Sequence, residues 1–358
     1  MPNESRYDLD RDAWSALLGD EPRFRLEQIW NGLYHQGRGL DELSTLPKAL
    51  RERLAQAAPL ALTPVTESVS DQGDTIKFLW ELDGGARVET VLMHYKDRST
   101  VCLSTQAGCA MACSFCATGQ AGFERHLSVG EIVEQLAVAR QRAATGPTPR
   151  RVSNIVFMGM GEPLANYDNT WAAIRRIHGD MEIGARHLTV STVGVVPGIR
   201  RMAAEELPVN LAVSLHAADD ELRDELVPLN RRYPLEELVG ACIDYYEATH
   251  RRVSFEWAMI DGVNDRREDA ERLAAIARRV RAHVNLIPLN PTPGYAVRGS
   301  SGNRVRAFRA ELERHGVNVT VRDTRGSEID AACGQLRAGH EATPVRLGGA
   351  RRSQVARR

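Results

Sequence analysis

Three cysteines lie within eight residues, in the stretch CAMACSFC, at Cys109, Cys113 and Cys116. Four thiolates would complete an ordinary zinc or iron–sulfur site, whereas three leave one coordination position that the loop itself does not fill. Because an open position is typical of a catalytic metal centre, we predict an open [4Fe–4S] cluster here. Two other interpretations stay open: a zinc site completed by Cys102, Cys333 or a histidine, and a redox dithiol at the lone CxxC pair.

The total number of cysteines indicates a reduced protein rather than a disulfide scaffold. The chain holds six cysteines in 358 residues, which is too few for a disulfide framework in a chain of this length. Clustered thiols in such a chain indicate metal binding or catalysis. Cys242 is the exception, because it lies in the apolar helical pattern LVGACIDYY and is predicted to be a core residue.

The charge of the chain does not by itself indicate a nucleic-acid partner. The formal net charge is −1. Of the 46 cationic residues only Lys48, Lys77 and Lys96 are lysines, and the arginine excess fits both a GC-rich coding bias and contacts with phosphates and base edges. The stretch from Arg337 to Arg358 carries six arginines and one acid. It predicts a flexible basic tail, either in contact with RNA or merely solvated.

No segment of the sequence indicates export or insertion into a membrane. The N-terminal stretch MPNESRYDLDRDAW is polar and lacks the apolar core of a signal peptide. The sequence also lacks the run of about 18 apolar residues that a membrane-spanning helix would need. The expected location is therefore the cytoplasm, and no membrane partner is expected.

Alternating strand-like and helix-like segments from about residue 100 must position the cysteine loop. Six strand-like runs, most of them followed by an amphipathic helix such as SVGEIVEQLAVARQRAA, predict parallel strands. Six units are fewer than the eight of a closed barrel, so we predict an α/β fold with a partial (βα)6 barrel. The cysteine loop directly follows the first strand and so lies at the carboxyl ends of the strands, where barrel sites are found. The runs are TVCLST, VSNIVFMG, HLTVST, VNLAVSL, VSFEWAMI and VNLIPL, with VNVTVRD as a late strand.

The segments before and after this core differ from it in pattern. Residues 1–62 show helical spacing, for example in RFRLEQIWNGLYHQG, and are predicted to form a small N-terminal helical domain. Residues 63–98 hold two strand-like runs around the dipeptide Gly84-Gly85 and are predicted to form a β-hairpin linker. Residues 99–336 are assigned to the barrel and a C-terminal loop that folds back over the site, and residues 337–358 to the tail.

CxxxCxxC after the first strand of a partial barrel resembles the radical S-adenosylmethionine (SAM) enzymes. In that superfamily the amino and carboxylate groups of SAM chelate the open iron, and one electron from the cluster splits the sulfonium to give a 5′-deoxyadenosyl radical. The resemblance thus implies that the fourth ligand is the cosubstrate. Seven further stretches are similar to motifs of the RlmN-type RNA methyltransferases: VETV, CLSTQAGCAMACSFCATG, GMGEPLANYDN, STVGVVP, LAVSLHA, NLIPLNPTPG and TRGSEIDAACGQL.

Residues at the ends of the predicted strands are the candidate SAM contacts. Gly161 would let a ligand approach the backbone closely, and the Glu162 carboxylate can accept hydrogen bonds from the ammonium group of SAM. By resemblance, residues that end the third, fourth and sixth strands also contact SAM. They are Ser191, Ser214, Leu215, His216 and Asn290.

Cys333, Cys102 and Glu89 carry the unusual part of the implied chemistry. The target carbon of adenine is not nucleophilic, so direct methyl transfer from a sulfonium fails there. In the family two SAM molecules are used: the Cys333 thiolate takes a methyl group from one, and the radical from the other abstracts hydrogen from that methyl group. The methylene radical adds to adenine, and Glu89 accepts the ring proton. Cys102 then attacks the Cys333 sulfur, which releases the product and leaves a disulfide.

The resemblance also implies a substrate and partners. The expected target is carbon 2 of adenine in 23S rRNA near the peptidyl transferase centre, before ribosome assembly is complete, with the adenine beside the anticodon of certain tRNAs as a second target. Expected partners are a flavodoxin or ferredoxin-type electron donor and a thiol reductant, and residues 1–62 are expected to bind RNA. Three alternatives stay open: a Cfr-like carbon-8 methyltransferase, a radical activase acting on a protein, and an RNA-binding protein with structural zinc.

Overall fold

The computed structural model describes residues 4–290, 297–322 and 325–339. The predicted tail beyond residue 339 lies outside the described residues, as do positions 291–294 of the NLIPLNPTPG motif and position 324 of TRGSEIDAACGQL. Within the described ranges, no helix is both long and apolar enough to cross a membrane.

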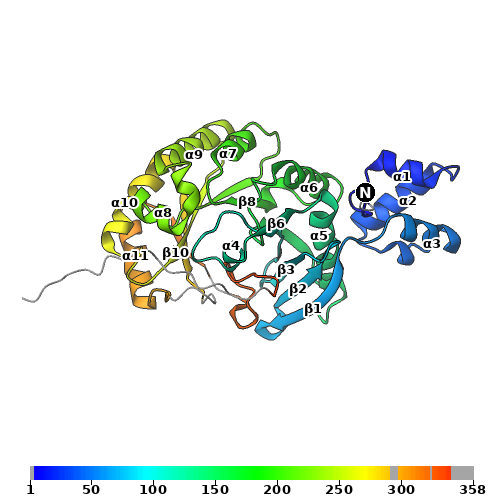
Figure 1. Cartoon of the computed structure of the whole chain (residues 1–358), viewed down its shortest axis with the longest axis horizontal. Coiled ribbons are helices and arrows are strands. Elements are labelled where there is room, and N and C mark those ends of the chain that lie inside the picture. The colour runs from blue at the N-terminus through cyan, green and yellow to red at the C-terminus, as the bar shows by residue number, and fades with distance from the viewer. Residues whose placement is uncertain (1–3, 291–296, 323–324, 340–358) are drawn as a thin grey trace, which may run out of the picture.

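A ten-stranded mixed sheet forms the centre of the molecule (Figure 1). Its last seven strands run parallel to one another in the order of the sequence, as consecutive βα units require. The predicted partial (βα)6 barrel is confirmed, with the predicted late strand at its edge. The strands are β4 (Ser99–Cys102), β7 (Val152–Phe157), β8 (Leu188–Thr192), β9 (Asn210–Ser214), β10 (Ser254–Met259), β11 (His283–Pro288) and β12 (Val319–Val321).

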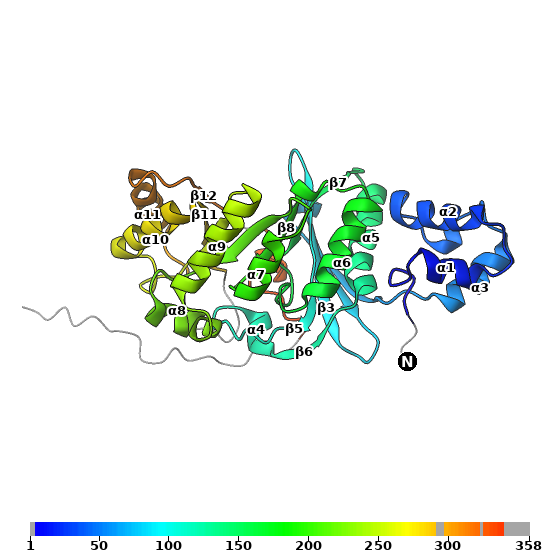
Figure 2. The same cartoon turned by 90° about the horizontal axis from the view of Figure 1, so that it is seen from above.

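Amphipathic helices cover the outside of this curved sheet (Figure 2). The longest, α5 (Val129–Thr145), begins with a capping box in which Ser128 and Glu131 bond to each other's backbone amides. Each helix returns the chain to the edge of the sheet where the strands begin, so the carboxyl ends of the strands lie together at the opposite edge. The other helices that follow strands are α6 (Tyr167–Gly179), α7 (Val196–Ala203), α8 (Asp220–Leu226), α9 (Leu235–Thr249), α10 (Arg267–Val280) and α11 (Gly302–Arg314).

The segment interpreted from sequence as a hairpin linker belongs to the main sheet. β2 (Thr75–Glu81) pairs antiparallel with β3 (Arg87–His94). β3 then pairs antiparallel with β4, which places Val91 opposite Cys102. The outermost strand, β1 (Thr63–Ser70), is missing from the sequence prediction because its mostly exposed residues show no apolar alternation. These three strands therefore extend the barrel wall rather than only joining two domains.

The N-terminal residues form a helical unit beside the barrel (Figure 2). The predicted helical stretch RFRLEQIWNGLYHQG contains α2 and a π-helical turn. The helical structure ends before Gly37, whose φ of 64° favours glycine. The Trp30 indole donates to an Asp180 carboxylate oxygen at 3.0 Å, which ties the unit to the end of α6. The helical elements are α1 (Arg11–Leu18), α2 (Phe24–Trp30), the π-helix (Asn31–His35), a 3-10 helix (Leu40–Glu42) and α3 (Lys48–Ala57).

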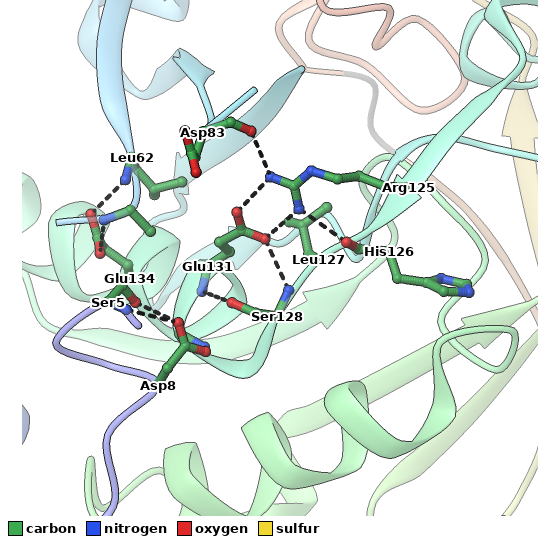
Figure 3. Close-up of polar contacts among 12 residues, drawn as sticks. Ser5, Asp8, Leu62, Asp83, Arg125, His126, Leu127, Ser128, Glu131 and Glu134 are labelled. Atoms are coloured by element: carbon green, nitrogen blue, oxygen red, sulfur yellow. Dashed lines mark hydrogen bonds and ion pairs between the residues drawn. The ribbon is translucent and has the colours of Figure 1, made fainter. Parts of the chain in front are cut away.

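Carboxylates on or beside α5 hold the N-terminal unit and the start of β1 against the barrel (Figure 3). Glu134 is fully buried and accepts hydrogen bonds from the backbone amides of Ala61 at 2.9 Å and Leu62 at 3.0 Å. Asp8 accepts a hydrogen bond from the amide of Gly130 at 2.6 Å, in the first turn of the same helix. Burial raises the pKa of Glu134 to about 7. Glu134 is therefore the fully buried carboxyl group among the contacts of this junction.

We predict that Glu134→Ala lowers the free energy of unfolding by about 2–4 kcal/mol, because two inward-facing backbone amides lose their acceptor. Urea titration followed by circular dichroism measures the change. Glu67→Ala is the matched control: Glu67 pairs with Arg142 of the same helix but is partly exposed, so its loss should cost less than about 1 kcal/mol. Equal losses in the two variants would contradict the assignment.

Candidate active site

The cysteine loop is closed at its base by a small two-stranded sheet. β5 (Gln106–Gly108) pairs antiparallel with β6 (Phe123–His126), and the Cys109 amide donates to the Gly122 carbonyl oxygen at 2.6 Å. Gly108 has a φ of 69°, and a Cβ there would lie 1.9 Å from that oxygen, so only glycine fits. Strands of three and four residues carry too little periodicity to be predicted from sequence. This sheet holds the two ends of the loop together.

The three clustered cysteines line a single cavity, as the open-cluster prediction requires. Burial raises the pKa of each thiol, to about 12 for Cys109, and the neighbouring thiols of Cys116 and Cys109 raise the pKa of Cys113 further. Three soft sulfur donors that line one cavity suit a cationic iron–sulfur cluster, whose positive charge would offset the cost of ionising them. Cys102 does not line this cavity, which weighs against Cys102 as a fourth ligand.

The carboxyl ends of β7 to β11 form much of the remaining cavity wall. The cavity encloses about 970 Å³ including its mouth, within the range of ligand sites, roughly 300–1,000 Å³. Six of the seven predicted SAM contacts line it. The exception is Leu215, whose side chain is fully buried in the core and whose carbonyl oxygen accepts from Arg223 Nε at 3.1 Å. The six are Gly161, Glu162, Ser191, Ser214, His216 and Asn290.

Glu162 links the loops after β7 and β8 through its carboxylate, and the start of β5 through its backbone amide. One of its oxygens accepts from the amide of Leu164 at 3.0 Å and the other from the amide of Val193 at 2.9 Å, while its own amide donates to Gln106 Oε1 at 2.8 Å. The preceding residue, Gly161, has a φ of 101°, and a Cβ there would lie 2.5 Å from Gln106. Burial raises the pKa of Glu162 to about 7, so a cationic ligand beside it would favour the ionised form.

His216 presents a neutral imidazole to the cavity. Burial, and then the nearby Arg223 guanidinium, lower its pKa to about 3. The amide of Ala258 donates to Nδ1 at 3.0 Å, which leaves the ring proton on Nε2. The ring lies edge-on to Phe115, with 4.5 Å between centroids. His216 can therefore donate one hydrogen bond without adding charge to the site.

Cys333 lies on the wall between this cavity and a second, smaller one. It lines both cavities, whereas Cys102 lines only the second. Burial, and then the neighbouring Cys333, raise the pKa of the Cys102 thiol to about 12. The structure thus brings together the two cysteines that sequence reasoning paired.

The segment that carries Cys333, drawn in orange-red in Figure 1, folds back onto the cysteine loop and lies close to α4 (Ala117–Ala121). The amide of Ala117 donates to the Gly334 carbonyl oxygen at 2.8 Å, and the Thr118 hydroxyl donates to the Leu336 carbonyl oxygen at 2.6 Å. On the other side, Asn290 Nδ2 donates to the Cys333 carbonyl oxygen at 3.1 Å. Three hydrogen bonds therefore hold this segment at the cavity.

Glu89 lies beside this segment but is not among the described residues that line either cavity. It is 3% exposed. Its Oε1 lies 2.8 Å from Lys77 Nζ, and its Oε2 accepts from the amides of Arg337 at 2.8 Å and Ala338 at 3.1 Å. The structure therefore brings Glu89 to the Cys333 segment without directing it at the cavity.

Sequence reasoning missed several residues at the site. Arg322, which follows β12, lines both cavities, and the nearby Cys333 raises its pKa. The sequence did offer a signal for Arg322, because it is a cation at the end of the predicted strand VNVTVRD. Glu256 lines the first cavity from within β10, and Gln106 orients Glu162. Neither has a spacing that separates it from ordinary strand residues.

Comparison with known proteins agrees with this geometry. The profile of the Radical SAM superfamily matches residues 103–274, and with the partial barrel and the three-cysteine cavity it defines a radical SAM enzyme. The chain is 51% identical to the "Probable dual-specificity RNA methyltransferase RlmN" of Salinispora tropica, over 94% of each chain. The protein of the same name from Chloroflexus aurantiacus is 49% identical, over 96% of this chain and 95% of that protein.

A solved structure is similar over nearly the whole fold. The crystal structure of a radical SAM methyltransferase from Sphaerobacter thermophilus has a TM-score of 0.90 and 49% identity, and the match covers 94% of this chain and 99% of that one. The chain therefore belongs to the RlmN family of radical SAM RNA methyltransferases. Membership implies a [4Fe–4S] cluster, SAM and an RNA substrate.

We predict that Cys109→Ala, Cys113→Ala and Cys116→Ala each abolish cluster binding and RNA methylation, because three thiolates are already one short of a full set. Iron and sulfide analysis after anaerobic purification, together with the visible absorbance, measures the loss. Cys242→Ala is the control, since Cys242 is fully buried in α9 and does not line the cavity; it should keep a full cluster. A normal cluster in Cys113→Ala protein would remove these residues from the metal site.

Proposed function

We propose that this enzyme methylates carbon 2 of adenine in 23S rRNA near the peptidyl transferase centre, with Cys333 as the methyl carrier. The position of Cys333 carries the proposal. A methyl carrier must meet SAM on one side and the substrate base on the other. Of the two cysteines with proposed catalytic roles, Cys333 alone lines both the cavity with the clustered cysteines and the cavity with Cys102.

Residues of the first cavity would bind the cosubstrate. Cys109, Cys113 and Cys116 would hold the cluster, which when bound supplies the single electron that cleaves SAM. The Glu162 carboxylate would accept hydrogen bonds from the ammonium group of SAM, and the neutral His216 would donate from Nε2. The remaining proposed contacts are Gly161, Ser191, Ser214, Asn290 and the backbone of Leu215. Two SAM molecules would be used in each turnover.

Cysteine chemistry would begin and end the methyl transfer. The Cys333 thiolate attacks the methyl group of SAM, so that a sulfur–carbon bond forms and S-adenosylhomocysteine leaves. After the carbon has joined the adenine ring, the Cys102 thiolate attacks the Cys333 sulfur. That attack forms a disulfide and breaks the bond between Cys333 and the product carbon, which leaves with the bonding electron pair and takes up a proton to complete the methyl group. An external thiol reductant restores both cysteines.

Glu89 is proposed as the acceptor of the proton that leaves the adenine ring. Its carboxylate already accepts bonds from Lys77 and from the amides of residues 337 and 338. These contacts place Glu89 beside the segment that carries Cys333, which supports a role in the reaction at that segment.

The remaining proposed partners follow from family membership. They are tRNA, methylated at the adenine beside the anticodon, a flavodoxin or ferredoxin-type electron donor, and the thiol reductant. The proposal places the enzyme in the cytoplasm, acting on 23S rRNA before ribosome assembly is complete. Residues 1–62, and the basic tail if it contacts RNA, would add to RNA binding.

Mass spectrometry of RNA from a strain that lacks this gene tests the proposal. We expect the carbon-2 methyladenosine of 23S rRNA to be absent, restored by the wild-type gene and not restored by Cys333→Ser, since a hydroxyl is a far weaker nucleophile than a thiolate. Chromatographic standards separate the carbon-2 and carbon-8 isomers. Loss of carbon-8 methyladenosine instead would establish the Cfr-like alternative, and an unchanged tRNA fraction would exclude tRNA.

We also predict that Cys102→Ala traps a covalent RNA–protein adduct, because nothing remains to attack the Cys333 sulfur and release the product. Denaturing gels of protein expressed with cellular RNA should show a slower band that ribonuclease removes. The double variant Cys102→Ala/Cys333→Ser is the control and should show no such band. Normal product formation without an adduct would exclude Cys102 from the mechanism.

A further inference from the structure

The segment of residues 325–339 is held in a conformation that part of its sequence disfavours. Asp330 and Ala338 have φ values of 52° and 53°, in the left-handed region that residues with a Cβ rarely occupy. Gly326 and Gly334 occupy the same half of φ space without this penalty. Strained residues persist only where surrounding groups fix them, so the contacts of Asp330 and Ala338 decide what holds Cys333 in place.

Both strained residues are bound by the same buried ion pair. Lys77 Nζ donates to the carbonyl oxygen of Asp330 at 3.3 Å, and Glu89 Oε2 accepts from the amide of Ala338 at 3.1 Å. Lys77 and Glu89 themselves lie 2.8 Å apart, with side chains only 13% and 4% exposed. Cys333 lies between the two bound positions in the sequence. One ion pair thus fixes the Cys333 segment on both sides of the cysteine.

The two partners come from the antiparallel strands that extend the barrel wall. Lys77 lies on β2 opposite Val91, and Glu89 lies on β3 opposite Leu79, so the pair is a diagonal across one face of the sheet. The Ser104 hydroxyl donates to the Glu89 carbonyl oxygen at 2.6 Å, which fixes this part of β3 against the start of the cysteine loop. The pair is therefore built on a rigid element, while the segment it binds is a loop.

We propose that Lys77 is a positioning residue for Cys333, clasping the segment directly at Asp330 and through Glu89 at Ala338. The inference rests on the proposed role of Cys333 as methyl carrier and deepens it. Lys77 balances the charge of a buried carboxylate that would otherwise be unpaired, and removing one partner of such a pair is strongly destabilising. Without the clasp the hydrogen bonds from Ala117, Thr118 and Asn290 would remain. The segment would lose its anchors on both sides of Cys333, so the distance of Cys333 from SAM would be less narrowly fixed.

Limited proteolysis measures the clasp without any need for turnover. Trypsin cleaves after arginine, and Arg325 and Arg337 flank Cys333 within the segment. We expect Lys77→Met to raise the rate of cleavage at these two sites about tenfold in otherwise folded protein, since cleavage follows the population of the open segment. Peptide mass spectrometry identifies the cut sites, and circular dichroism checks that the variant is folded.

Matched variants separate the clasp from a general loss of stability. Arg87→Met removes the exposed ion pair with Glu81 on the same two strands, and cleavage should stay within about twofold of wild type. Glu89→Gln should raise cleavage as Lys77→Met does, and the double variant should cleave no faster than the faster single variant, because both act on one contact. Lys77→Gln keeps a hydrogen-bond donor and loses the charge, so the cleavage rate should rise by less than in Lys77→Met. This variant also serves as the test if Lys77→Met fails to fold.

Methylation activity separates a positioning role of Lys77 from a purely structural one, because a purely structural lysine would not affect the methylation step alone. Single-turnover methylation per cluster should fall about tenfold in Lys77→Met while the apparent affinity for RNA and the iron content stay unchanged. Wild-type cleavage rates in both Lys77 variants, or a double variant whose rate is the product of the single effects, would overturn the inference. Absence of RNA methylation by wild-type protein would instead overturn the proposed function, and the cleavage comparison would still stand.

Discussion

Loop backbone that is buried must find hydrogen-bond partners, and in this enzyme buried polar side chains supply them. Gln135 of α5 accepts from the Ser104 amide at 2.9 Å and donates to the Ser104 carbonyl oxygen at 3.0 Å, at the entrance to the cysteine loop. Arg223 donates to the carbonyl oxygen of Val193 at 2.6 Å, beyond the end of β8. Glu162 and Glu89 do the same for the loops after β7 and at the C-terminus. The shape of the cavity thus depends on buried side chains that bind loop backbone, and only some of these also have a proposed role in the reaction.

The same burial sets the electrostatics of the cavity. Thiol pKa values are raised, the pKa of Glu162 is about 7 and that of His216 is about 3, all chiefly through loss of solvent. Each of these shifts favours the neutral form of the group. A cluster and a sulfonium ligand both bring positive charge, which would favour thiolates and a carboxylate at those positions. Positively charged ligands would therefore stabilise the ionised thiols and the ionised Glu162, which burial alone disfavours.

Much of the fold and part of the site could be predicted from sequence, for identifiable reasons. The six parallel strands and the cysteine loop could be predicted because apolar runs and cysteine spacing are local features. β1 and the β5–β6 pair could not, since one is exposed and the others are very short. Leu215 was expected at the SAM site, but a strand-end pattern cannot show which way one side chain turns. The partners of Glu89 depend on a contact between residues 77, 89 and 330–338, which no local pattern encodes.

The contact between Glu89 and the amide of Arg337 joins positions 248 residues apart in the chain. During synthesis the barrel strands and the cluster cysteines leave the ribosome before Cys333 does, and domains fold as units from the N-terminal side. The contact between Glu89 and Arg337 can form only after Arg337 has been translated. A partly made chain can therefore assemble the part that would cleave SAM while still lacking the cysteine that would carry the methyl group. The proposed methyl carrier would therefore be among the last parts of the site to join the fold.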